Sequence, residues 1–285
     1  MSVKKIGVLG AGSMGGGIAH LAAVSGIEVV LCDVEERYVD GALKRMAGFL
    51  DKSVEKQKMT VEEKEAALNR ITKTTKMEDM AELPLIIEAI FEDLEVKKDA
   101  FRKLDELCKP ETIIASNTSS MSITTLGAVT ARPDRVVGMH FFYPPVLMRL
   151  VEVIRGYYTS DETVNLVADV SKAMGKTPVI VKKDTPGFIV NRIMMPQFLE
   201  AIRIAEEGIA SIEDIDTAVK LGLNYPMGPF ELMDFSGVEI ALHVADYFVQ
   251  EYHDPKWVPP QLIKNLVRSG RLGRKTGAGW YDYNK

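Results

Sequence analysis

The chain alternates between short, almost continuously apolar stretches and longer segments with the apolar spacing of helices. Seven stretches rich in Val, Ile and Leu are expected to be strands: 4–10, 28–33, 85–90, 112–116, 135–140, 150–155 and 177–183. Helical patterns fall between them, near 13–25, 35–57, 61–69, 94–108 and 161–174. Continuously apolar strands are typical of sheets covered on both faces. The alternation therefore favours an α/β fold with a doubly wound, largely parallel sheet.

The pattern changes after the last of these stretches. Pro186 and Gly187 break regular structure and suit a linker. Beyond them the apolar spacing is helical, most clearly over 191–208 and 211–223, and no clear strand follows. We therefore expect two domains, an α/β domain over 1–185 and a smaller, all-helical domain over 186–285.

Composition narrows the class of protein. The 285 residues are 46% hydrophobic and 26% charged, as in globular proteins with a sizeable core, and the net charge of −5 disfavours nonspecific nucleic-acid binding. The two cysteines, Cys32 and Cys108, lack a metal-ligand spacing and suit a reducing compartment, so we expect no metal site. No apolar run reaches 18 residues, so we expect no membrane association and a cytoplasmic location.

A glycine-rich turn follows the first expected strand. Gly10, Gly12 and Gly15 form G-x-G-x-x-G between that strand and the first helix. The first glycine permits a tight turn, the second lets a pyrophosphate approach the backbone, and the third allows close packing of helix on strand. Ser13 and Met14 begin the helix, whose N-terminal N–H groups are suited to bind phosphate. This context predicts a dinucleotide-binding, Rossmann-type domain.

Asp33 bears on which dinucleotide binds. It lies 18 residues past Gly15, at the end of the second expected strand, where a carboxylate hydrogen-bonds the adenosine ribose hydroxyls. Its negative charge would repel a 2′-phosphate, so NAD is favoured over NADP, although Arg37 lies near enough to leave that preference open. The alternative for Asp33 is an exposed acid at a strand end.

Candidate chemistry gathers at the carboxyl ends of the strands, where ligands bind in open α/β sheets. Asn117 and Ser119 follow one strand and should line the cofactor crevice, and His140 ends another. Asn191 would come from the helical domain. Hydride transfer from an alcohol needs a base for the hydroxyl proton and donors that hold the oxygen. His140, Ser119 and Asn191 are residues of those types.

Glu152 is expected to be the partner of the histidine. The strand ending at His140, a loop with two prolines and the strand 150–155 form a hairpin-like return that can place Glu152 beside the imidazole. The carboxylate would then orient the ring and stabilise its protonated form, as in hydrolase triads. The alternative is that Glu152 forms an ion pair with Arg149 or Arg155 and only stabilises the sheet.

These residues belong to a wider resemblance that spans almost the whole chain. The matching motifs occur in order: "GAGSMGGGIA", "EAIFEDLEVKK", "ASNTSSMSIT", "GMHFF", "RLVEVIRG", "DTPGFIVNR", "YPMGPFEL" and "GRKTGAGWYDY". The chain resembles the 3-hydroxyacyl-CoA dehydrogenase family, and within it the short bacterial 3-hydroxybutyryl-CoA dehydrogenases. The resemblance implies an NAD-binding domain, a helical domain that dimerises, and oxidation of 3-hydroxyacyl-CoA to 3-ketoacyl-CoA.

The resemblance also implies roles for the catalytic residues. The family's base corresponds to His140 and its acidic partner to Glu152, and its contacts to the substrate oxygen correspond to Ser119 and Asn191. Ser119 could also cap the helix expected near 122, a role compatible with the first, and Asn191 could cap a helix or satisfy buried backbone. The family usually has Asn in "HFFNP" where this chain has Tyr143, so its acyl-chain preference is left open.

Four further residues carry an implied role with a simpler alternative. Glu92 and Lys97 match a family stretch that lies near the cofactor, but Glu92 could be a solvated acid and Lys97 part of an ordinary charged helix face. Lys52 and Lys56 are four residues apart and share a helix face. The family places lysines there near the phosphates of coenzyme A, whereas spacing alone suggests exposed side chains without a ligand.

Two other functions fit the same fold. One is a non-catalytic role, as in a lens structural protein of this family. The other is a Rossmann dehydrogenase of free 3-hydroxyacids, whose members use a lysine as base. The set of Ser119, His140, Glu152 and Asn191 favours an enzyme acting on an acyl-CoA, with a preference for short chains.

Overall fold

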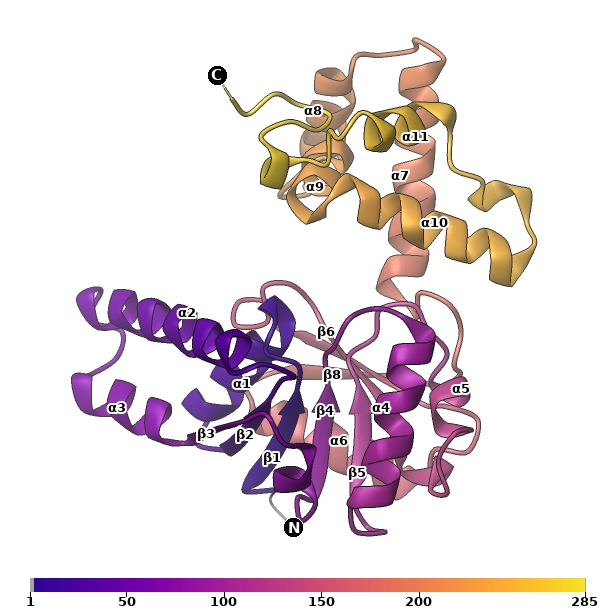
Figure 1. Ribbon diagram of the computed structural model, residues 1–285. Coiled ribbons are helices and arrows are strands. Elements are labelled where there is room, and N and C mark those ends of the chain that lie inside the picture. Colours follow the sequence, from indigo (N-terminus) through magenta and orange to yellow (C-terminus); the bar gives the residue numbers. More distant parts are fainter. Residues whose placement is uncertain (1–2, 285) are drawn as a thin grey trace. The chain divides into compact units, whose positions relative to one another are not determined.

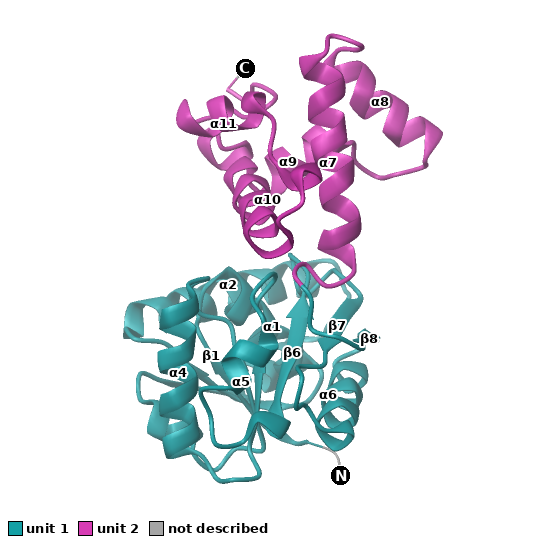
Figure 2. Cartoon of the chain, turned by 90° about the vertical axis from the view of Figure 1, so that its right-hand side faces the viewer, with its two compact units in different colours: residues 1–185 teal, residues 186–285 magenta. Residues whose placement is uncertain are grey.

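A computed structural model describes residues 3–284 of the chain. The chain divides into two compact units, residues 1–185 and residues 186–285 (Figure 2). This division falls at Pro186, the position expected from the Pro-Gly pair. No helix among residues 3–284 combines the length and the apolar character needed to cross a membrane.

The first unit is built on one eight-stranded sheet with the order β3-β2-β1-β4-β5-β6-β7-β8. The strands are β1 (Lys5–Leu9), β2 (Glu28–Cys32), β3 (Ile71–Thr74), β4 (Leu85–Glu88), β5 (Ile113–Ser116), β6 (Val136–Phe141), β7 (Leu150–Ile154) and β8 (Thr177–Val181). Every neighbouring pair is parallel except β6 and β7, which are antiparallel. The doubly wound, largely parallel sheet is therefore confirmed. Seven strands match the expected ones, and only β3 was not predicted.

Helices cover both faces of the sheet (Figure 1). They are α1 (Ser13–Val24), α2 (Glu36–Glu55), α3 (Val61–Asn69), α4 (Leu94–Leu107), α5 (Ile123–Gly127) and α6 (Asp161–Ala173). Short 3₁₀ turns η1 (Met77–Met80) and η2 (Pro133–Arg135) lie in the connections. The suggestion that Ser119 caps a helix is wrong, because Ser122 is the N-cap of α5 and its hydroxyl accepts the N–H of Thr125. A serine one turn closer to the helix has the geometry to cap it.

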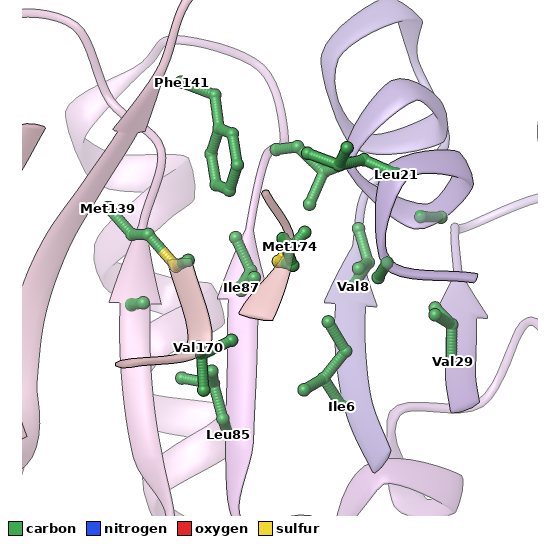
Figure 3. Close-up of a cluster of buried hydrophobic side chains, with 14 of the residues drawn as sticks. Ile6, Val8, Leu21, Val29, Leu85, Ile87, Met139, Phe141, Val170 and Met174 are labelled. Atoms are coloured by element: carbon green, nitrogen blue, oxygen red, sulfur yellow. The ribbon is translucent and has the colours of Figure 1, made fainter. Parts of the chain in front are cut away.

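The main core lies between the sheet, α1 and α6 (Figure 3). Alternate residues of the strands point to this side, among them Ile6, Val8, Leu85 and Ile87, and all four are fully buried. Phe141 closes the cluster at the end of β6. Each such side chain stabilises the fold by about 1.5–3 kcal/mol on burial. This packing fixes the strand ends from which the polar side chains of the site extend.

The second unit consists of helices without a sheet. These are α7 (Val190–Glu206), α8 (Ile212–Gly222), α9 (Pro229–Ser236), α10 (Val238–Tyr252) and α11 (Gln261–Arg268), with 3₁₀ turns η3 (Pro255–Trp257) and η4 (Arg274–Thr276). Between residues 186 and 284 the only β pairing is two isolated bridges near the C-terminus. The all-helical second unit is therefore as expected. Its core is rich in aromatic residues, including Phe230, Phe248 and Trp257.

Two buried aspartates tie the C-terminal segment to this unit. Asp234 accepts the backbone N–H groups of Trp280 and Tyr281, at 2.9 and 3.0 Å. Asp216 accepts the N–H of Phe230 at 2.9 Å and the hydroxyl of Tyr281 at 2.7 Å. Carboxylates that accept several donors can remain buried without an ion pair. The segment "GWYDY" is therefore held by side-chain hydrogen bonds rather than by a strand.

Candidate active site

The glycine turn has the geometry of a phosphate cradle. Gly10 has a φ of 104°, and a Cβ there would overlap the carbonyl group of Ala89. A Cβ on Gly15 would overlap the carbonyl oxygen of Gly10, so helix and turn can only pack with glycine there. Beside Gly12, in contrast, a Cβ would meet no atom within 4 Å. That open space lies at the start of α1, whose N-terminus has no side-chain cap, so the residues fit a bound pyrophosphate.

Asp33, which follows the end of β2, is hydrogen-bonded to this turn. Its two carboxylate oxygens accept the N–H groups of Ala11, at 2.6 Å, and of Val34, at 2.7 Å. The side chain is half-buried, so it is not simply an exposed acid. Arg37, the residue that left the choice between NAD and NADP open, is exposed and pairs with Glu35 at 2.8 Å. The turn and the carboxylate thus form one rigid unit.

His140 and Glu152 are cross-strand partners in the antiparallel pair of β6 and β7. The distance from His140 Nδ1 to Glu152 Oε2 is 2.8 Å. His140 is 3% exposed and Glu152 is completely buried, so water does not weaken the interaction. The guanidinium of Arg155, a partner considered for Glu152, binds Asp161 and the carbonyl oxygen of Thr159. The hairpin-like return expected from the sequence is therefore confirmed, with the carboxylate beside the imidazole.

Asn117 connects the ends of two neighbouring strands. It follows β5, and its side-chain oxygen accepts the N–H of Phe141 at 2.9 Å. Phe141 is the residue after His140, so this bond holds the end of β6 next to the loop after β5. Ser119 lies in that loop, and its backbone N–H donates to Glu92 at 3.1 Å. The loop residues predicted to line the crevice are thus fixed close to the strand end that carries His140.

Lys97 does not lie on an exposed, charged helix face. Its side chain is 1% exposed, and its ammonium lies 2.6 Å from Glu88 and 3.1 Å from Glu92. The reading of an ordinary charged helix face is wrong for Lys97 and describes its neighbour Lys98, which pairs with Glu95 at 2.7 Å. Two carboxylates hold the ammonium group, and the cofactor contact expected of Lys97 stays a prediction.

Three residues of this region were not identified from the sequence: Glu88, Ser116 and Thr118. All three are buried and belong to the same hydrogen-bond network as Lys97. Glu88 offered a signal, because it is a carboxylate inside the apolar run "LIIEAI". A buried charge must be paired, so such a residue predicts a partner elsewhere in the chain.

Lys176 is a second buried lysine that sequence reasoning missed. Its ammonium donates to the carbonyl oxygens of Pro145 and Met148, both at 2.7 Å. Burial lowers the pKa of this lysine. The two carbonyls belong to the loop between β6 and β7, so Lys176 anchors the connection between the strands of His140 and Glu152. Tyr143 lies on this loop and is 56% exposed.

Three of the expected site residues lie away from this cluster along the chain. Lys52 is in the last turn of α2, and Lys56 follows as the C-cap residue. Both are exposed, and neither forms an ion pair within the described part of the chain. Asn191 is the second residue of α7 and belongs to the second unit.

Comparison with known proteins identifies the family over nearly the full length. The model of the 3-hydroxyacyl-CoA dehydrogenase NAD binding domain matches residues 5–185, and the model of the C-terminal domain of the same family matches residues 187–283. The chain is 46% identical to a probable 3-hydroxybutyryl-CoA dehydrogenase of Deinococcus radiodurans over 283 residues, which covers 98% of this chain and 100% of that protein. It is 43% identical to the human mitochondrial hydroxyacyl-coenzyme A dehydrogenase, covering 99% of this chain and 91% of that one.

Solved structures agree with this assignment. The crystal structure of (S)-3-hydroxybutyryl-CoA dehydrogenase from Ralstonia eutropha has a TM-score of 0.96 with this chain at 44% identity, and the match covers all of both chains. Both family models, the full-length relatives and the glycine cradle lead to the same conclusion: the chain belongs to the 3-hydroxyacyl-CoA dehydrogenase family and is an NAD-dependent oxidoreductase.

Proposed function

We propose that this protein interconverts 3-hydroxyacyl-CoA and 3-ketoacyl-CoA, and that its short-chain pair is 3-hydroxybutyryl-CoA and acetoacetyl-CoA. The observation that carries the proposal is the buried contact of 2.8 Å between His140 and Glu152 at the carboxyl edge of the sheet. The relatives support the choice of substrate, since those from Clostridioides difficile and Bradyrhizobium diazoefficiens are named 3-hydroxybutyryl-CoA dehydrogenase.

In the oxidative direction His140 is the general base. The carboxylate of Glu152 accepts a hydrogen bond from Nδ1–H of the ring, so the lone pair on Nε2 is directed to the C3 hydroxyl of the substrate. Nε2 takes the hydroxyl proton while the C3–O bond becomes a carbonyl and the C3–H bond breaks with its electron pair. Bound NAD supplies the hydride acceptor. General-base catalysis of this kind contributes roughly 10²–10⁴-fold to the rate.

Other residues of the chain hold the reactants in place. Ser119 and Asn191 orient the substrate oxygen through hydrogen bonds and support its partial charge. The backbone N–H groups of Ser13 and Met14, at the open start of α1, bind the pyrophosphate. Gly12 leaves the space for the pyrophosphate, and Gly10 and Gly15 allow the tight turn that places it there.

Asp33 binds the adenosine ribose, and its half-buried carboxylate disfavours a 2′-phosphate. Asn117 lies beside the crevice as part of its wall. Glu92 is 41% exposed, so one side of its carboxylate remains accessible to a cofactor. Lys97, whose ammonium is held by Glu88 and Glu92, is proposed to lie beside the cofactor with Glu92.

Lys52 and Lys56 are proposed to pair with the phosphates of coenzyme A. Both ammonium groups are exposed at the end of α2, and such ion pairs are weakened by salt. An acyl-CoA substrate carries several phosphate charges that a free 3-hydroxyacid lacks. A contribution from these lysines would therefore separate the two substrate classes.

The second unit is proposed to form a homodimer. Several large apolar side chains on and after its helices are strongly exposed, including Ile193, Leu221 and Leu223, at 60%, 81% and 59%. Ile193 and Leu223 line an apolar groove of about 790 Å³ formed mainly by α7 and its neighbours. Contiguous exposed apolar surface of this kind marks interfaces between proteins.

The assay that tests the proposed function follows the loss of NADH absorbance with acetoacetyl-CoA. We expect turnover with the CoA thioester and at most weak turnover with free acetoacetate. Equal turnover of the free acid would favour a dehydrogenase of free 3-hydroxyacids, and no turnover of either would favour a non-catalytic role. A panel from four-carbon to sixteen-carbon thioesters then measures the chain-length preference that the exposed Tyr143 leaves open.

A further inference from the structure

The segment that leads from the sheet to the second unit is bound to the first unit by one carboxylate. Asp184 lies three residues after β8 and two residues before Pro186, the first residue of the second unit. Its Oδ2 accepts the hydroxyl of Ser122 at 2.6 Å and the backbone N–H of Thr124 at 2.7 Å. Both donors lie at the start of α5, 62 and 60 residues earlier in the chain. One acid thus joins the connecting segment to the start of a distant helix.

These two bonds go beyond the capping of α5. A helix cap is normally supplied by the residue at the helix start. Ser122 supplies it here, since its hydroxyl accepts the N–H of Thr125 at 3.1 Å. Asp184 adds a charged acceptor, and hydrogen bonds to charged groups are shorter and stronger than those between neutral groups. Because this acceptor comes from the connecting segment, the bonds fix the position of that segment as well as that of the helix.

The loop before α5 is held independently of Asp184. The hydroxyl of Thr118 donates to Glu92 at 2.6 Å and accepts the N–H of Met121 at 3.0 Å. The backbone N–H of Ser119 also donates to Glu92, at 3.1 Å. The loop and the start of α5 therefore form a fixed support to which the carboxylate of Asp184 binds.

The residues that follow Asp184 are held within the second unit. The carbonyl oxygen of Pro186 accepts the hydroxyl of Tyr252, in α10, at 3.0 Å. Phe188 is 2% exposed and has a φ of 51°. A bulky residue keeps such a left-handed backbone only where its surroundings enforce it. Asn191 lies seven positions after Asp184, in the first turn of α7, so a displacement of Asp184 is passed on to it through a short, constrained stretch of chain.

We propose that Asp184 is a positioning residue for Asn191: by binding the start of α5, it fixes the segment from which α7 begins. The inference rests on the proposed function, in which Asn191 and Ser119 hold the same substrate oxygen. The two residues belong to different units, so they need a link that sets their separation. Asp184 binds the support of the Ser119 loop and lies shortly before Asn191 in the chain. A misplacement of about 1 Å in such a group costs roughly 10²-fold in rate.

The first experiment is a double-mutant cycle between Asp184→Ala and Asn191→Ala. We expect Asp184→Ala to lower kcat with acetoacetyl-CoA by roughly 10- to 100-fold, because Asn191 is displaced. In the Asn191→Ala background the same substitution should lower kcat by less than about threefold, because the amide that it positions is gone. An equal loss in both backgrounds would overturn the inference, and so would an unchanged kcat in Asp184→Ala alone.

The variant Asp184→Asn separates position from charge. Both hydrogen bonds go to the same carboxylate oxygen, and the amide oxygen of Asn has the two lone pairs needed to accept both. We expect this variant to retain most of the kcat that Asp184→Ala loses. A loss as large as that of Asp184→Ala would assign the effect to the negative charge and overturn the positional role. The control is Ser160→Ala, which removes a cap bond to the N–H of Thr163 in α6 and should lower the stability without changing kcat.

The second measurement does not depend on activity. Hydrogen exchange of the Thr124 amide should be faster in Asp184→Ala than in the wild type, because its acceptor is lost. The Met121 amide, which donates to the Thr118 hydroxyl, should exchange as in the wild type. Faster exchange at Met121 would show that the substitution loosens the Ser119 loop itself, and it would overturn the inference.

The outcomes separate this inference from the proposed function. If the wild type does not reduce acetoacetyl-CoA, the proposed function fails, and exchange at Thr124 still decides whether Asp184 binds α5; unchanged exchange there overturns the inference. If Asp184→Ala does not fold, Ser122→Ala removes one of the two bonds to Asp184 and should show the same coupling to Asn191→Ala. The absence of that coupling would also overturn the inference.

Discussion

Replacement of Glu152 by Gln tests the central pair of the site directly. Gln has the same size and can still accept the Nδ1 proton, so the ring can keep its place. What is lost is the negative charge beside the imidazolium that forms as His140 takes the substrate proton. With Nδ1 and Oε2 2.8 Å apart, the charge centres are separated by about 4 Å. At an effective dielectric constant of about 20 the lost attraction is about 4 kcal/mol.

That energy sets the expected size of the effect. A difference of about 1.4 kcal/mol changes a rate tenfold, so kcat should fall by roughly 10³, within a range of about 10² to 10⁴. The affinity for NADH should remain, and the free energy of unfolding should change by about 1 kcal/mol, the difference between a charged and a neutral hydrogen bond. Steady-state kinetics, NADH titration and denaturant unfolding measure the three quantities.

A matched control is Glu28→Gln, at the exposed start of β2 in the same sheet, which should change none of them. The catalytic role would be refuted if Glu152→Gln lowered kcat less than about threefold while the free energy of unfolding fell by more than about 2 kcal/mol. A loss of that size is typical of a broken buried network. Glu152 would then be a structural residue.

Four more predictions follow from the structure. Asp33→Ser should weaken NADH binding and narrow its advantage over NADPH in steady-state assays, whereas an unchanged ratio would exclude Asp33 as the ribose ligand. Lys52→Ala with Lys56→Ala should raise the KM for acetoacetyl-CoA and flatten its dependence on salt; an effect on NADH alone would assign the lysines to another site. Light scattering at micromolar concentration should give the mass of a dimer, and a monomer would contradict the proposed interface. Burial and the bond to Asp216 raise the pKa of Tyr281, so stability should be complete below the unfolded-state pKa of about 10 and fall as the pH rises above it. Denaturant unfolding of Tyr281→Phe should show a weaker decline above that pH, and an identical decline would mean that Tyr281 is not its source.

The fold could be predicted where the hydrophobic pattern was strong. Strands such as β4 and β5 are buried on both faces, so their apolar runs stood out from the helices around them. β3, with the sequence Ile-Thr-Lys-Thr, has no fully buried residue because it lies at the edge of the sheet. An edge strand needs apolar residues on few positions, and its pattern resembles that of a loop. Its position became apparent only from its pairing with β2.

The part of the candidate site that is formed by residues close together in the sequence was predictable. The hairpin of β6 and β7 is local, since Glu152 lies twelve positions after His140, so their pairing could be inferred from strand length and the loop. The role of Ser122 as cap could not be separated from that of Ser119, because three serines lie in a row of four residues. Which one caps the helix depends on where the helix begins, and helix boundaries are poorly determined by pattern.

Lys97 shows why the remainder of the site was out of reach. Among neighbours such as Lys98 and Glu95, a lysine on an amphipathic helix is usually exposed, and its charge pattern alone cannot indicate burial. What buries Lys97 is Glu88, a carboxylate in an apolar strand nine residues earlier, which cannot remain ionised in the core without a cation. The strand carries a carboxylate among apolar residues, and the helix buries a lysine. Each feature is unfavourable alone, and the ion pair between them stabilises both. The pattern of either element alone therefore could not reveal the burial of its charged residue, because each buried charge is stabilised by a partner outside its own element.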